Sequence, residues 1–237
     1  AAMRLSEAEC LLMVADMKGG GSHEACQFAE QAAADARAVF KEVGAAKMEG
    51  LACLALAAVH YASQAQKAAA AASGSALELL AGDPRCKARA LHATALAISV
   101  GVCTGAHLER GLQCAKSAME IYGSLGLAKA EAAETSFAAR WCLWMCRPKD
   151  ALPLATQAAE AFKGLGYGRG WYAESRGLVT KALMGTHDWR GALRCARDNL
   201  EEFRRSPEDR RFLVVPLERL ARCHLESWNV HRQGGTA

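Results

Sequence analysis

A large apolar residue recurs about every forty-one positions along this chain. The five recurring residues are Phe40, Leu80, Tyr122, Phe162 and Phe203, at spacings of 40, 42, 40 and 41. Each is followed four positions later by a residue that ends helices, and these residues are Gly44, Pro84, Gly126, Gly166 and Pro207. A period of this length is typical of proteins built from stacked copies of one small unit. The sequence therefore predicts a repeat architecture that runs through the whole chain.

Small or short side chains precede each large residue by eleven, seven and four positions. They are Ala29, Ala33 and Ala36; Ala69, Ser73 and Ala76; Gly111, Ala115 and Ala118; Ala151, Ala155 and Ala158; and Ala192, Ala196 and Asn199. These offsets fall on one face of an α-helix, where small side chains let a neighbouring helix approach closely. A second apolar helical run lies between each stopper and the next such helix, so each repeat is a hairpin of an A helix and a B helix. The expected helices, alternately A and B, are 6–18, 23–43, 46–63, 65–81, 84–102, 106–124, 127–145, 149–164, 168–184, 188–205 and 207–227.

Composition supports a chain made of helices. Alanine, the strongest helix former, occurs 51 times, whereas Val, Ile and Thr together occur 19 times. Asp83-Pro84 and Ser206-Pro207 each place a capping side chain before a proline at the first helical position. Pro216 lies inside the last expected helix, where it should kink or shift that helix. The predicted fold class is all-α, with five helical hairpins and a final helix.

Charge and hydropathy exclude two classes of partner. The net charge of +4 is well short of the dense positive face that nucleic-acid binding requires. The longest stretch without an acidic or basic side chain, 90–108, is mostly alanine and small polar residues, whereas a bilayer helix needs about 20 predominantly apolar residues. We therefore expect neither nucleic-acid binding nor membrane insertion.

The ten cysteines are dispersed through the helical pattern without a C-x-x-C pair, which favours buried free thiols in a reducing compartment over a disulfide framework. We expect a cytoplasmic or other reducing intracellular location, and an organellar one stays open because the chain begins Ala1-Ala2-Met3. Cys142 and Cys146 share a helix face, but no further ligand lies at metal-site spacing, so core packing is the favoured interpretation. No phosphate-binding glycine loop or nucleophile motif is present. The sequence thus predicts no metal, no cofactor and no enzymatic activity.

An Ala-x3-Ala-x2-Ala motif carries a resemblance to a known family. Ala151, Ala155 and Ala158, within DALPLATQAAEAFKGLG, resemble helix B of a tetratricopeptide repeat (TPR), and GLQCAKSAMEIYGSLG and GALRCARDNLEEF repeat the pattern. The common TPR period is about 34 residues. The period of 40–42 is similar to the long variants of kinesin light chains and regulator-type TPR domains. The chain departs from short TPRs in lacking a tryptophan at the usual helix A position.

The resemblance implies a right-handed α-solenoid that forms one domain over 1–237. Its repeats would span 6–44, 45–84, 85–126, 127–166 and 167–207, with a last helix at 207–227. The A helices would line a concave surface that binds a peptide or a partner helix.

Groove-facing positions carried over from the family are apolar in the first half of the chain and charged in the second. They are Leu51, Leu54, Tyr61, Leu96, Val100 and Cys103, then Ser136, Arg140, Trp144, Glu174, Lys181, Met184, Glu218 and Arg222. This order would suit a partner segment with a hydrophobic part and an acidic part. The expected partner-binding residues are Tyr61, Arg140, Trp144, Lys181 and Arg222.

Alternatives stay open at this stage for single residues and for the function. Arg140 and Lys181 are equally well explained as solvated surface residues, and Trp144 and Trp171 as core residues, while Trp141 is expected in the core. The predicted function is a protein-interaction scaffold that binds a peptide or helix in its groove. The alternative is an accessory subunit permanently docked in a larger, even organellar, assembly, which should bury a broad hydrophobic patch.

Overall fold

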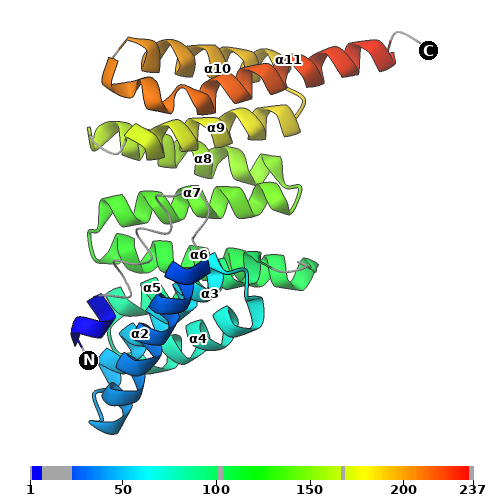
Figure 1. Cartoon of the computed structure of the whole chain (residues 1–237). Helices are drawn as coiled ribbons and strands as arrows, with labels where there is room; N and C mark the ends of the chain where they lie inside the picture. Colours follow the sequence, from blue (N-terminus) through cyan, green and yellow to red (C-terminus); the bar gives the residue numbers. More distant parts are fainter. Residues whose placement is uncertain (1, 7–22, 101–103, 167–168, 206, 235–237) are drawn as a thin grey trace. The chain divides into compact units, whose positions relative to one another are not determined.

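The computed structural model describes residues 2–6, 23–100, 104–166, 169–205 and 207–234. Within these residues the chain is helical and contains no strand, which confirms the all-α prediction (Figure 1). The contacts divide the chain into two compact units, Ala1–Gly126 and Leu127–Ala237. The division falls between two predicted repeats, 85–126 and 127–166. The organisation as a single domain stays a prediction.

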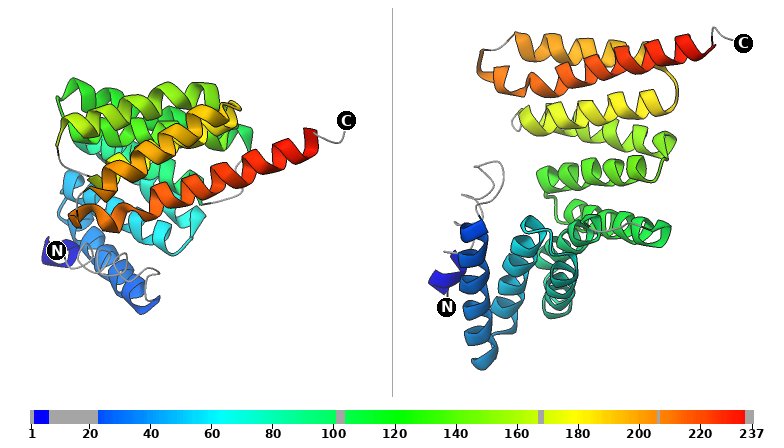
Figure 2. Two further views of the ribbon diagram at one scale, coloured as in Figure 1. Left: turned by 90° about the horizontal axis from the view of Figure 1, so that it is seen from above. Right: turned by 45° about the vertical axis from the view of Figure 1, so that its right-hand side comes forward.

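Unit 1 consists of helical hairpins packed in chain order. Its helices are α2 (His23–Glu42), α3 (Ala46–Ala62), α4 (Gln66–Leu79), α5 (Pro84–Ser99) and α6 (Gly105–Ser124), after a short helical turn at 2–6. Each helix from α2 to α6 contacts the next, and α3 also contacts α5 (Figure 2). The first predicted helix, 6–18, lies outside the described residues except for Ser6.

Unit 2 repeats the same arrangement. Its elements are α7 (Ala128–Trp144), α8 (Pro148–Gly164), α9 (Arg169–Gly185), α10 (Trp189–Arg204), the 3-10 helix η1 (Pro207–Phe212) and α11 (Val214–Gly234). Consecutive α-helices contact each other from α7 to α11, and α9 also contacts both α7 and α11. The A-type helices α7, α9 and α11 are therefore neighbours along one side of this unit, which is the side that positions the candidate site.

Burial confirms the predicted helix register. All the residues at the small positions are buried, and so are the five large residues that follow them. Ala115 and Ala155 are fully buried at the middle of this face, whereas Ala128 is exposed. The large residues fill the space near the turns, as Phe162 does by stacking on Trp171 at a centroid distance of 6.0 Å. Close helix approach at small residues and filling by a large one explain why the pattern recurs.

Residues in the left-handed backbone region end helices of both types. The predicted stoppers Gly44, Gly126 and Gly166 have φ of 70°, 67° and 67°. After A helices the same conformation occurs at Gln64, Cys146 and His187, with φ of 60°, 55° and 61°. The turns after α3, α7 and α9 each contain an equivalent backbone hydrogen bond. The N–H of Ala65 donates to His60 O (2.8 Å), that of Arg147 to Cys142 O (2.8 Å) and that of Asp188 to Leu183 O (2.9 Å). These bonds satisfy carbonyls at the helix ends, so the turn forms without glycine.

The predicted cap at Asp83 is confirmed. Its side chain accepts a hydrogen bond from the backbone N–H of Cys86 at 3.1 Å, and Pro84 occupies the first helical position of α5. The carboxylate also pairs with Lys47 Nζ at 2.7 Å, which joins α3 to α5. Lys47 and the Cys86 N–H together lower the pKa of Asp83 to about 2. The other expected cap, Ser206, lies outside the described residues.

The predicted last helix, 207–227, is wrong at both ends. Residues 207–212 form a 3-10 helix, and the α-helix runs from Val214 to Gly234. Starting at Val214 places Pro216 in the first turn, where its missing N–H needs no partner; the first helical bond runs from Leu217 N to Leu213 O at 3.0 Å.

The 3-10 helix is held by side chains of its neighbours. Arg169 Nη2 pairs with Asp209 at 2.9 Å and Arg169 Nη1 pairs with Glu202 at 3.3 Å. The same guanidinium lies 4.7 Å from the centre of the Phe203 ring. These contacts join the start of α9, the end of α10 and η1.

Eight cysteines lie in the described part of the chain, and all are free thiols, six of them buried. This agrees with the expectation of buried free thiols. Cys142 is buried in the core, whereas Cys146 is exposed in the turn after α7. In the part of the chain that the structure describes, no helix is long and apolar enough to cross a membrane.

Candidate functional site

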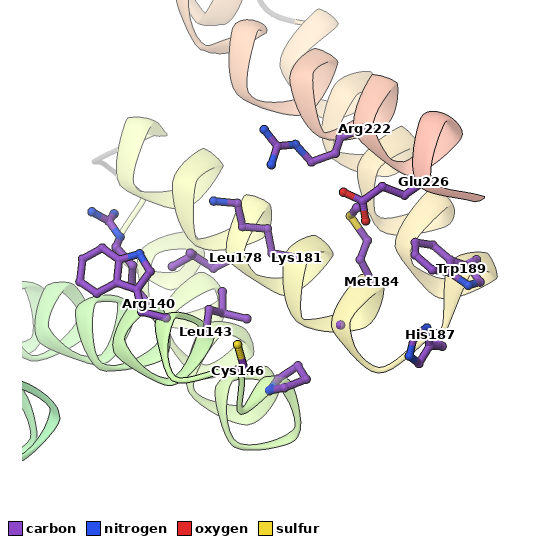
Figure 3. A pocket seen from close by; sticks show the side chains of 13 residues that line it. Arg140, Leu143, Cys146, Leu178, Lys181, Met184, His187, Trp189, Arg222 and Glu226 are labelled. Atoms are coloured by element: carbon purple, nitrogen blue, oxygen red, sulfur yellow. The ribbon is translucent and has the colours of Figure 1, made fainter. Parts of the chain in front are cut away.

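A cleft of about 680 Å3 opens in unit 2 along the A-type helices (Figure 3). Its lining residues are Arg140, Leu143, Trp144, Cys146, Pro148, Leu178, Lys181, Met184, Gly185, His187, Trp189, Arg222 and Glu226. They come from the end of α7, the α7–α8 turn, α9, the α9–α10 turn and α11. Four of the five expected partner-binding residues therefore lie around one cavity.

The repeat itself places a cation from each A-type helix in this cleft. Arg140, Lys181 and Arg222 are spaced by 41 residues and come from α7, α9 and α11. Because consecutive A-type helices are in contact, the same register position recurs along the cleft. Arg140, Lys181 and Arg222 are called the cation ladder below.

The three cations of the ladder differ in how they are paired. Arg140 Nη2 lies 3.1 Å from Glu174 Oε1, and Arg222 Nη2 lies 3.3 Å from Glu218 Oε1. Lys181 makes no hydrogen bond or ion pair with any described residue. The sequence analysis made the same prediction for Arg140 and Lys181, whereas in the structure Arg140 has an ion-pair partner and Lys181 has none among the described residues. Lys181 is the cation whose charge a ligand can neutralise without breaking an existing pair.

Burial and neighbouring cations act together on Lys181. The pKa of its amine is lowered, first by burial and then by the nearby Arg219, while Glu174 opposes the shift. Arg219 is itself buried and pairs with Glu218 at 3.1 Å. A carboxylate bound beside Lys181 would favour the charged amine, so the cleft is electrostatically suited to an anion.

Trp144 forms an aromatic wall on the rim of the cleft. It is 46% exposed and packs edge to face on the fully buried Trp141, with ring centroids 5.0 Å apart. Phe137 lies edge-on to it at 6.5 Å. This packing holds the exposed indole in place before any partner arrives. The core position expected for Trp141 is confirmed, and Trp144 lies partly outside the core.

Apolar side chains form the floor between the cations. Leu143, Leu178 and Met184 line the cleft, and the last two are buried. His187 and Trp189 close the end nearest the α9–α10 turn, their rings 6.0 Å apart. The cleft therefore combines an apolar floor, an aromatic rim and positive charge.

Several residues expected in the groove lie elsewhere. Tyr61 is at the end of α3 in unit 1 and is no part of this cleft. Leu54 is buried in the core of unit 1, and Ser136 is buried between α7 and α9, where Ser175 Oγ donates to Ser136 Oγ at 3.2 Å. Cys103 lies outside the described residues. These positions face helix contacts because A-type helices also pack on one another.

The sequence interpretation missed the rim residues His187, Trp189 and Glu226. Of these three, the repeat offered a signal for His187, because Cys146 and His187 are 41 residues apart and both end an A-type helix. A turn residue that recurs at the repeat spacing lies at the same end of each hairpin. Within the part of the chain that the structure describes, no group of three or more His, Cys, Asp or Glu residues could hold a metal ion.

Comparison with solved structures defines the class of fold as TPR-like helical repeats. The chain is similar to the crystal structure of the nearly identical TPR-like repeats of a Podosopora anserina protein described as a kinesin light chain. That likeness has a TM-score of 0.67 at 12% sequence identity and covers 85% of this chain and 98% of that chain. No protein-family model and no curated protein matches the sequence.

Proposed function

We propose that this chain is a protein-interaction module, and that the cleft of unit 2 binds a partner segment carrying an acidic side chain next to an apolar one. The observation that carries the proposal is Lys181, a half-buried cation without a partner among the described residues, at the centre of the cation ladder. A carboxylate next to Lys181 gains a charge-assisted interaction in a partly desolvated site. We also propose that the module is one of the long TPR variants, since its repeat period is 40–42 residues.

The apolar part of the partner would contact Trp144 and the floor. Tryptophan is among the residue types most enriched in the few positions that dominate binding at protein interfaces. The cleft offers Leu143 and Leu178 beside Trp144 for such a side chain. The cleft, its aromatic rim and its charge support binding rather than catalysis. Its free thiols are consistent with a reducing intracellular compartment, cytoplasmic or organellar.

Selection from a displayed peptide library tests the proposal without a known partner. Peptides selected on the purified chain should be enriched in Asp or Glu one to four residues from an aromatic or leucine. Selection on a Lys181→Glu variant should lose that enrichment, because the cleft would repel acidic peptides. Selection on Arg197→Glu serves as the control, since Arg197 is exposed on α10 and lies outside the cleft.

Equal enrichment on all three proteins would place binding elsewhere. It would also favour the second function predicted from the sequence, a subunit docked permanently in a larger assembly through another surface.

A further inference from the structure

Helix α11 carries an apolar stripe on the side that faces away from its own unit. The stripe consists of Val214, Leu217, Ala221, Leu225 and Trp228, all of them exposed. Val214, Leu225 and Trp228 are 69%, 65% and 68% exposed. These positions lie at i, i+3, i+7, i+11 and i+14, so they form one continuous line along the helix.

The opposite side of α11 is buried in the core of unit 2. Pro216, Arg219 and Cys223 are buried, and Cys223 packs on Met184 and Ala192. With about 100° of turn per residue, the centre of this buried face is roughly 165° from the centre of the stripe. The helix thus buries one face and exposes an apolar stripe on the other, whereas the last element of a repeat protein normally shows a polar outer face to water. The C-terminal half of α11 also projects past the end of α10 (Figures 1 and 2).

The order of residues in the stripe is symmetric about Ala221. Leu217 and Leu225 lie four residues before and after it, and Val214 and Trp228 lie seven residues before and after it. An antiparallel pair of identical helices crossing at Ala221 would therefore bring leucine onto leucine and valine onto tryptophan. The small side chain at the crossing point allows close approach. A surface that is complementary to itself in this way is what a two-fold interface requires.

Charged residues beside the stripe would also form opposite-charge pairs with a second copy packed antiparallel. Glu218 and Arg222 lie on the same flank of α11, on either side of the crossing point, and are 3.3 Å apart within one chain. In an antiparallel pair the same flank of each helix meets, so Glu218 of one copy faces Arg222 of the second copy. Opposite charges at such flanking positions set orientation between paired helices.

We propose that the stripe on α11 is the docking surface for a second copy of this chain, which packs antiparallel with Ala221 on the two-fold axis. Two helices that meet over about 21 Å bury less than about 1,200 Å2, which places the dimer in the weak, reversible class. The apolar stripe lies on a different side of α11 from the cleft, and Arg222 borders both surfaces. Leu217 and Leu225 do not line the cleft, so changing them should weaken the dimer without altering a cleft residue.

Sedimentation of the full chain between about 1 and 100 μM tests this proposal. The wild type should pass from monomer to dimer across the series. The double variant Leu217→Glu/Leu225→Glu should stay monomeric, with an unchanged melting temperature because both positions are exposed. The matched control, Val39→Glu/Val43→Glu, changes two exposed apolar residues of α2 and the following turn and should leave the dimer intact. A wild type that stays monomeric throughout, or a dimer that survives the double variant, would overturn the proposal.

Disulfide trapping tests the orientation. In a Cys146→Ser background, Ala221→Cys should form a disulfide-linked dimer with itself, because the residue lies on the axis. Leu217→Cys and Leu225→Cys should each stay unlinked alone and should link when mixed. Self-linking of both single variants would indicate parallel helices and contradict the antiparallel arrangement. Loss of library-peptide binding in the Leu217→Glu/Leu225→Glu variant would contradict the separation from the cleft.

Discussion

At the scale of single residues, two glycines of unit 1 both have room for a Cβ and differ in backbone conformation. A Cβ added at Gly44 or at Gly74 would meet no atom within 4 Å. Gly44 has φ of 70°, whereas Gly74 lies within α4. Gly44→Ala should lower the free energy of unfolding by about 1–2 kcal/mol because an L-residue is strained there. Gly74→Ala should raise it by about 0.5–1 kcal/mol. Urea denaturation measures both, and changes of the same sign would contradict the assigned turn.

Asp83 makes stability depend on pH at the α4–α5 turn. Its pKa is about 2 in the folded protein and 3.8 in the reference state, so the folded state favours the ionised form. Its contribution is therefore fully present above about pH 4 and is lost as the pH falls from about 4 to about 2. Asp83→Ser keeps a capping oxygen and removes the charge. The difference in melting temperature between wild type and Asp83→Ser should shrink over that range, and a constant difference would show that the Lys47 pair does not contribute.

The sequence could predict some turn residues and not others. Gly44, Gly126 and Gly166 stand out because glycine tolerates a positive φ. Gln64, Cys146 and His187 adopt the same conformation with side chains that carry no such signal. Backbone hydrogen bonds to carbonyls at the helix ends stabilise these turns. Such bonds depend on where the helix ends and not on the type of the turn residue. The rim of the cleft includes Cys146 and His187, so residue type did not reveal this part of the site, and only their 41-residue spacing indicated it.

At the scale of helices, close packing at small residues predicts where extra volume is not tolerated. Ala115→Leu and Ala155→Leu enlarge fully buried positions and should each cost about 1–3 kcal/mol of stability by overpacking. Ala128→Leu changes an exposed residue and should have little effect. Thermal melts of the three variants compare them directly. Equal melting temperatures would show that the small face does not form the helix contacts.

The helix boundaries could be predicted where they follow the periodic sequence pattern. They could not be predicted where contacts between residues distant in the sequence determine them. The register from α2 to α10 follows from local spacing, because each B-type helix repeats the same face. At 207–214 the local signal of Pro207 indicated an α-helix. The structure has η1 there because Arg169, far away in sequence, binds Asp209, and because Pro216 fits only near the start of α11. Contacts of this kind produce no periodic pattern in the sequence.

At the scale of the whole molecule, the repeat predicts one domain although the contacts fall into two units. In stacked repeats each hairpin is stabilised by its neighbours, so unfolding spreads along the chain. A single calorimetric transition for the full chain would support the single-domain prediction. Two resolved transitions, with Gly44→Ala shifting one and Ala155→Leu the other, would show that units 1 and 2 fold separately.

The chemistry of the molecule is concentrated in unit 2, where the cation ladder, Trp144 and the apolar floor share one cleft. Periodicity could place Arg140, Lys181 and Arg222 at equivalent positions. It could not show that Glu174 and Glu218 pair with the two arginines and leave Lys181 without a partner among the described residues. Those pairs form between or along helices whose relative rotation depends on packing. The charge available to a ligand was therefore visible only in the structure.

Isothermal calorimetry with the strongest library peptide tests the central claim most directly, comparing wild type, Lys181→Glu, Trp144→Ala and Arg197→Glu. We expect Lys181→Glu and Trp144→Ala each to weaken binding by roughly tenfold or more. Arg197→Glu should bind as the wild type does, and the wild-type affinity should fall with added salt. Unchanged affinity in Lys181→Glu and Trp144→Ala, with both variants folded by thermal melt, would contradict the account.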